Sequence, residues 1–154
     1  MLDSTTVLKG IATTTTVINT LNSLVKGTKG VKRALLLELQ SNIQLILLYR
    51  DDDAPIDKVI NKLEISQCKA ALESNFNFNS LKRTRVSKSV AKVSSEYGHY
   101  VGWTTEQLFA NIYLRTKNLQ NLVDVDPTNR KFRKRVRLIN ILKLMLLLLR
   151  HLKS

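Results

Sequence analysis

The residues of this chain that point most clearly to chemistry are six cations packed into eight positions. They are Arg130, Lys131, Arg133, Lys134, Arg135 and Arg137. Guanidinium and ammonium groups at this density attract polyanions such as nucleic acids. On a helix, four of the six share one ridge at i, i+3, i+4 and i+7, namely Arg130, Arg133, Lys134 and Arg137. Because a helix N-terminus disfavours cations, we expect an anion to neutralise this ridge, with Phe132 and Val136 turned inward.

A second basic run lies near the middle of the chain. It contains Lys82, Arg83, Arg85, Lys88 and Lys92 among serines and threonines, and both a mobile loop and a weak helix fit it. The net charge of +13 favours nucleic acid or anionic lipid as the partner over a merely solvated surface or an acidic protein. We predict that 82–92 and 130–137 form one surface that holds phosphates without reading bases.

Side chains that bind metals are scattered along the chain. His99, His151 and Cys68 show no ligand spacing. The three consecutive aspartates at 51–53 indicate a turn at a helix end. A divalent cation held by Asp51, Asp53 and Asp57 is a weaker alternative. We therefore predict no metal site and no cofactor.

Signatures of nucleotide hydrolysis and nucleophilic catalysis are missing. The stretch 26–30 has the sequence KGTKG, which lacks the spacing of a phosphate-binding loop, although its two lysines could still contact a phosphate. No GxSxG motif occurs. We expect a protein that is not an enzyme and has no catalytic residues.

The aromatic stretch 97–103 allows two interpretations. Tyr97, His99, Tyr100 and Trp103 could stack on bases, as in single-strand binding proteins. We favour a packed turn with Trp103 in the core, because Gly98 and Gly102 suggest tight local folding.

The single cysteine, Cys68, indicates a small buried hydrophobe. Together with the lack of a secretory signal it predicts a cytoplasmic protein.

Helical periodicity dominates the rest of the chain and predicts an all-α, up-down bundle of four to five helices in a single domain, 1–154. Only five glycines and two prolines interrupt it. Asp53 with Pro55, and Asp126 with Pro127, resemble helix starts, and Thr104 with Gln107 fits a capping box. The expected helices span about 4–26, 28–49, 53–76, 104–124 and 126–152.

The end of the last predicted helix, 138–152, is leucine-rich on most of its surface. It is either the central helix of the bundle or a subunit interface, and the leucine count favours a protein partner or a homo-oligomer. Its basic start and apolar back also fit a helix that acts at a membrane surface, our second alternative. The run is too short and too charged to span a bilayer.

In architecture, the predicted bundle resembles the HEPN ribonucleases. Their catalytic pattern, an arginine followed by a histidine after four to six residues, is absent at both His99 and His151, so the resemblance implies a HEPN-like bundle without its usual motif. The architecture also resembles the small basic bundle proteins that accompany bacterial reverse transcriptases. We therefore expect a non-catalytic accessory protein that binds RNA or single-stranded DNA within a larger protein or ribonucleoprotein complex.

Overall fold

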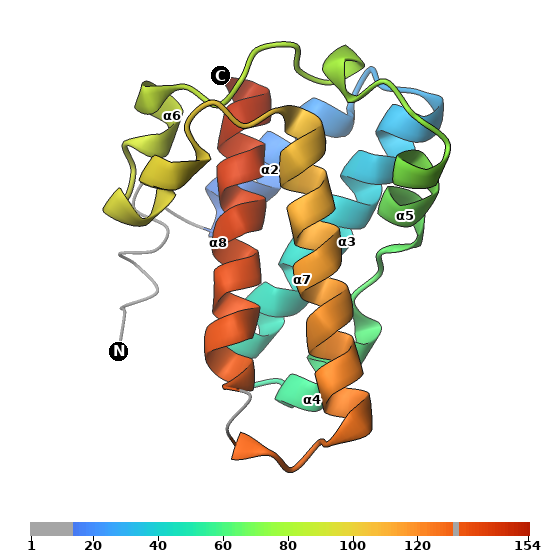
Figure 1. Ribbon diagram of the computed structural model, residues 1–154, viewed down its shortest axis with the longest axis vertical. Coiled ribbons are helices and arrows are strands. Elements are labelled where there is room, and N and C mark those ends of the chain that lie inside the picture. Colours follow the sequence, from blue (N-terminus) through green and yellow to red (C-terminus); the bar gives the residue numbers. More distant parts are fainter. Residues whose placement is uncertain (1–13, 131–132) are drawn as a thin grey trace.

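The computed structural model describes residues 14–130 and 133–154, and this part of the chain is helical without strands (Figure 1). The all-α prediction is thereby confirmed. The elements are α2 (Thr14–Val25), α3 (Gly30–Asp52), α4 (Ile56–Lys62), α5 (Ser66–Glu73), η1 (Phe78–Ser80), α6 (Lys88–Ala91), η2 (Ser95–Tyr100), α7 (Thr105–Val125) and α8 (Lys134–Lys153). None of the described helices is long and apolar enough to cross a membrane. The predicted start of the first helix, at 4–13, lies outside the described residues.

Successive segments run up and down the long axis of the molecule (Figure 1). Helix α3 descends, α4 and α5 climb back, α7 descends and α8 returns. The α4–α5 pair takes the place of one predicted helix, and α6 forms where no helix range was predicted, so the described part has more α-helices than we predicted. Buried apolar side chains from these segments form one continuous core.

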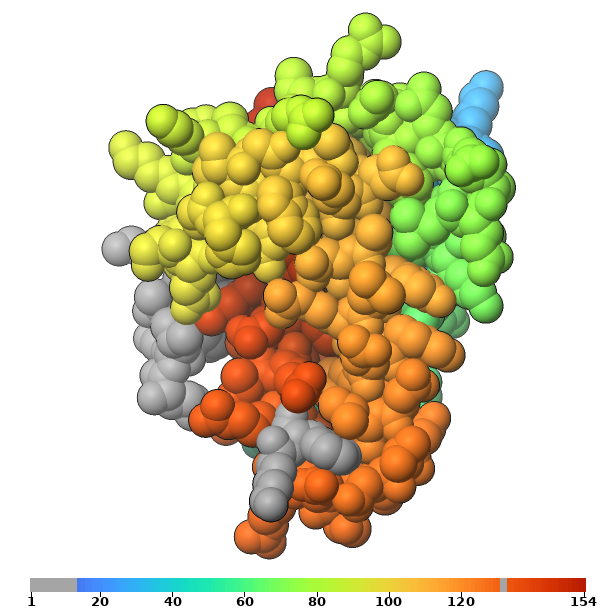
Figure 2. Space-filling model, viewed as in Figure 1, coloured from blue at the N-terminus to red at the C-terminus, as the bar shows by residue number. Residues whose placement is uncertain are grey.

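Helix α8 is the centre of the bundle. It contacts α2, α3, α4, α6 and α7, and every residue at 141–149 is buried. In Figure 2, α7 and the segment containing η2 cover most of this helix. Of the two interpretations of the leucine-rich segment, the central helix is confirmed. The leucine side chains of α8 pack in the core of the chain itself, so their number is no argument for a protein partner.

The junction between α3 and α4 differs from the prediction. Asp53 adopts a left-handed conformation, with φ of 53°, and its main-chain N–H donates to the carbonyl of Leu48. It therefore closes α3, and Pro55, not Asp53, is the N-cap residue of α4. Aspartate tolerates this conformation better than most residues, so one residue type fits either helix end.

The predicted helix at 53–76 is broken at 63–65 by two buried polar residues of α3. The Asn42 side chain accepts from the main-chain N–H of Glu64 at 2.8 Å and donates to its carbonyl at 2.6 Å. The Glu38 carboxylate accepts the N–H groups of Gln67 at 2.7 Å and Cys68 at 3.0 Å. These bonds satisfy main-chain N–H and C=O groups that have no helical partner at the break, so the break is stable.

The segment 80–103 folds into short turns and is not one weak helix. Val86 exchanges two main-chain hydrogen bonds with the aromatic segment, donating to Trp103 and accepting from Gly102, both at 2.9 Å. Tyr97 and Tyr100 are buried and Trp103 packs against the core. The packed-turn interpretation is confirmed.

Helix α7 begins as predicted, with both hydrogen bonds of the Thr104–Gln107 capping box present. The predicted helix start at 126–127 is wrong, because Asp126 ends α7 and α8 begins only at Lys134. Asp126 accepts from the Asn129 amide at 3.1 Å, and its carbonyl accepts from the Asn129 main-chain N–H at 3.2 Å. These bonds stabilise a turn in place of the first helical turn.

Candidate nucleic-acid interface

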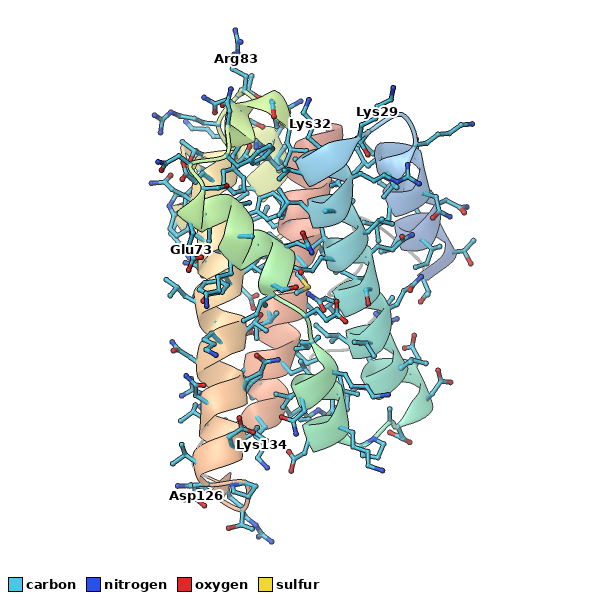
Figure 3. All side chains as sticks on the ribbon, turned by 90° about the vertical axis from the view of Figure 1, so that its right-hand side faces the viewer. Lys29, Lys32, Glu73, Arg83, Asp126 and Lys134 are labelled. Carbon is cyan, nitrogen blue, oxygen red and sulfur yellow. The ribbon has the colours of Figure 1, made fainter. Side chains whose placement is uncertain are left out.

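The two basic clusters predicted to form one surface lie at opposite ends of the bundle. Figure 3 shows Arg83 at one end and Lys134 at the other. Helix α8, with 20 residues, separates them, which corresponds to about 30 Å along the helix axis. The prediction of a single basic surface is therefore wrong, because the sequence pattern does not show that α8 starts at the end remote from 82–92.

The predicted ridge within 130–137 is not formed either. Arg130 precedes the helix, and Arg133 has a left-handed φ of 50° at the position before its first turn. Residues without helical geometry do not share a helical face with Arg137. Val136 is 47% exposed and does not turn inward. Lys131 and Phe132 lie outside the described residues.

Lys134 is engaged in contacts within the chain. Its ammonium lies 2.9 Å from Asp57 Oδ1 and 3.2 Å from Oδ2, and it also donates to the carbonyl of Pro127. Six aspartates belong to the helix ends and turns at this end of the bundle: Asp51, Asp52, Asp53, Asp57, Asp124 and Asp126. They oppose the positive potential of the exposed side chains of Arg130, Arg133, Arg135 and Arg137.

The other end of the bundle gathers cations from three separate segments. These are the turn between α2 and α3 with the first turn of α3, the loop before α6, and the end of α8 (Figures 1 and 3). We call this surface the basic end and define it by Lys26, Lys29, Lys32, Lys82, Arg83, Arg85 and Lys153. Lys32 and Lys82 are half-buried, and the other five are exposed. Glu73 in α5 and Glu106 in α7 are acidic residues on neighbouring helices.

Sequence reasoning found part of this surface. It marked Lys82, Arg83 and Arg85, and noted the two lysines of the KGTKG turn. Lys88, which it also marked, begins α6 and lies outside the basic end as defined. Sequence reasoning missed Lys32 and Lys153. Neither belongs to a charge run, and only the meeting of helix ends brings them near the loop.

The loop of the basic end is held in place from below. Lys82 donates to the main-chain oxygen of Ser154, and the Lys82 carbonyl accepts from Thr105 Oγ1 at 2.8 Å. The same hydroxyl lies 3.0 Å from Nε2 of the buried His151. Burial, with a smaller contribution from the charge of Lys82, lowers the pKa of His151 to about 4. A neutral imidazole therefore supports the loop at physiological pH.

Arg85 is held on the other side of this loop. Its Nη1 donates to the carbonyl of Gly102 at 2.9 Å, next to the main-chain bonds between Val86 and the aromatic segment. The main chain of the loop is therefore anchored while the Arg83 side chain points away from the bundle (Figure 3). Anchored main chain with projecting cations is suited to binding a phosphate backbone.

Other candidate chemistry is not brought together. Among residues 14–130 and 133–154, no group of three or more His, Cys, Asp or Glu side chains could hold a metal ion. Cys68 is buried, and its Sγ lies 3.5 Å from the carbonyl oxygen of Phe109. Burial raises the pKa of this thiol to about 12, so it stays protonated.

No protein-family model, curated protein or solved structure matches this chain.

Proposed function

We propose that this protein is a non-catalytic accessory protein that binds RNA or single-stranded DNA through the basic end. The observation that carries the proposal is the convergence of seven cations from three segments distant in the sequence. Their repulsion opposes folding, and phosphate groups would relieve it. The protein would work in the cytoplasm, where a free thiol such as Cys68 stays reduced.

Binding at this surface would rest on phosphate contacts. Lysine and arginine at a phosphate backbone release counterions, so affinity depends on salt and little on sequence. The 130–137 cluster is a lesser candidate contact for the same polymer, because Lys134 is already paired and six aspartates lie at that end. A protein partner within a larger complex remains part of the proposal.

The proposal is tested by fluorescence anisotropy with a labelled single-stranded RNA of mixed sequence. The double variant Lys29→Glu/Arg83→Glu removes two cations of the basic end. The matched control, Lys58→Glu/Lys62→Glu, makes the same charge change on α4 at the other end. We expect roughly tenfold or greater loss of affinity for the first variant and little change for the control, with unchanged helical circular dichroism. Equal affinity of both variants would refute the basic end as the binding surface.

The alternative of a membrane-surface effector receives less support from the fold. The apolar side chains of α8 that would enter a membrane are buried in the core. The helix would have to leave the bundle to expose them. Anionic vesicles serve as the competing ligand in the same assay, and binding to vesicles without binding to RNA would favour the alternative.

A further inference from the structure

A second polar site lies on the side of the bundle, between η2, α7 and α8. It is an open pocket of about 300 Å³ lined by Glu96, Tyr97, His99, Tyr100, Arg115, Asn140, Lys143 and Leu144. Figure 2 shows the surface hollowed between the yellow segment containing η2, the orange α7 and the red α8. Its volume lies at the lower end of the range for small-ligand pockets.

The inner wall of this pocket is an ion pair between the buried Lys143 and Glu96, whose side chain is 49% exposed. Lys143 is only 8% exposed and stands in the middle of the central helix, α8. Its ammonium lies 3.0 Å from Glu96 Oε2 and 3.4 Å from Oε1. The Tyr97 hydroxyl donates to the Lys143 carbonyl at 3.2 Å, which ties η2 to the same turn of α8. Because the Glu96 carboxylate stays accessible beside the buried ammonium, the pair offers an acceptor and a donor to a ligand in the pocket.

The outer wall presents groups with unused hydrogen-bonding capacity. Arg115 donates through Nε to Asn111 at 2.6 Å and through Nη2 to the Tyr100 hydroxyl at 3.5 Å, which leaves Nη1 for a ligand. The Asn140 amide makes no hydrogen bond to the described part of the chain. The exposed His99 ring lies 3.9 Å from the Tyr100 ring, centroid to centroid. The pocket thus offers a ring for stacking at His99, an amide with free donor and acceptor at Asn140, and a cation for an anionic group at Arg115.

We propose that this pocket takes one unstacked guanine nucleotide of a bound single strand, an inference that rests on the proposed function and adds base selectivity to it. A guanine edge offers two adjacent N–H donors and a carbonyl acceptor. Glu96 would accept from the two donors, and Lys143 would donate to the carbonyl. The base would stack on His99, Asn140 would bond the remaining edge and Arg115 would hold the phosphate.

The pocket is connected to the basic end through the chain. Tyr100 accepts the main-chain N–H of Trp103 at 3.0 Å, and Trp103 accepts that of Val86 at 2.9 Å. Arg85 of the basic end contacts Gly102 in the same turn. These bonds join the pocket wall and the loop of the basic end in one turn, so we expect a strand bound at the basic end to extend to the pocket.

Two assays test this inference. Titration with GMP, AMP, CMP or UMP followed by NMR should show the tightest binding for GMP, with shifts at His99 and Asn140. In anisotropy, a ten-nucleotide U-tract with one central G should bind about fivefold more tightly than the all-U tract, a gap of about 1 kcal/mol. Asn140→Leu should remove this preference and keep the all-U affinity. Asn118→Leu, an exposed change on α7, should alter neither.

The outcomes separate the two proposals. Binding of the all-U tract without any preference for G, or a preference that survives Asn140→Leu, would overturn the pocket assignment and leave the basic end in place. Tightest binding of another mononucleotide would overturn guanine as the ligand. If GMP binds at the pocket while no oligonucleotide binds, the proposed function fails and the pocket stands as a nucleotide site.

Discussion

The ammonium of Lys134 lies 2.9 Å from Asp57 Oδ1, so the first residue of α8 is tied to the first turn of α4. This contact assigns an internal role to the cation at the middle of the densest basic run. The Lys134 side chain is 17% exposed and that of Asp57 is 42% exposed. Because Lys134 is already paired within the chain, the basic end at the opposite end of the bundle is the better candidate for the nucleic-acid interface.

Asp57→Asn removes the charge partner of Lys134 and keeps the size of the side chain. We expect the free energy of unfolding to fall by about 0.5–1 kcal/mol, as is usual for partly exposed pairs. Urea unfolding at low and high salt measures this, and the difference from wild type should shrink as salt rises. Asp52→Asn, on an exposed neighbour, is the control. An equal effect of the two substitutions would argue against the pair.

Glu38→Ala removes the acceptor for the main-chain N–H groups of Gln67 and Cys68. Burial raises the pKa of Glu38, and the hydrogen bonds from those two residues oppose that rise. We expect a loss of about 1–3 kcal/mol in the free energy of unfolding, because the buried N–H of Cys68 and the part-buried N–H of Gln67 lose their acceptor. Glu38→Gln should lose less, since its amide oxygen still accepts. Urea unfolding of both variants is the measurement, and an unchanged midpoint for Glu38→Ala would show that the carboxylate does not stabilise α5.

His151 should make folding sensitive to acid. Its pKa is lowered from about 6.5 to about 4, chiefly by burial, so the unfolded chain binds the proton more readily. Stability due to this group is therefore complete above about pH 6.5 and is lost as the pH falls toward 4, by roughly 3 kcal/mol at most.

Urea midpoints measured from pH 7.5 to 4 test this dependence of stability on pH. His151→Phe keeps the ring volume and removes the titration, so its dependence on pH should be flatter than that of wild type. A steep slope that persists in His151→Phe would assign the acid sensitivity to other groups.

Leu142→Ala tests the central position of α8. Leu142 is fully buried, so truncation should lower the free energy of unfolding by about 2–5 kcal/mol. Val136→Ala, at a position that is 47% exposed, should change it by no more than about 0.5 kcal/mol. Thermal unfolding compares the two. A mild effect of Leu142→Ala in a monomer would mean that this part of the helix is not packed in the core.

The long helices could be predicted because their signals are local. The apolar spacing of α3 and α7 lies within each helix, and the Thr104–Gln107 capping box spans only four residues. The break between α4 and α5 could not be predicted, because it depends on Asn42 and Glu38, 22 to 30 residues earlier in the chain. Asp126 with Pro127 has the composition of a helix start, but bonds to Asn129 stabilise a turn instead.

The candidate site was predictable in its residue types but not in its geometry. Lys82, Arg83 and Arg85 stand out as a charge run, whereas Lys32 and Lys153 join them only because helix ends meet. The side pocket depends on Lys143, which looks like one polar interruption of an apolar run. Its partner Glu96 comes from a turn 47 residues away.

The most direct test of the basic end is the salt dependence of single-stranded RNA affinity. Each phosphate contact contributes about 0.7 to the slope of log affinity against log salt for a single strand. Lys29→Gln/Arg83→Gln should therefore lower the slope by about 1.4, while Lys58→Gln/Lys62→Gln leaves it unchanged. A slope that is the same in wild type and in Lys29→Gln/Arg83→Gln, or that falls equally in both double variants, would contradict phosphate binding at this end of the bundle.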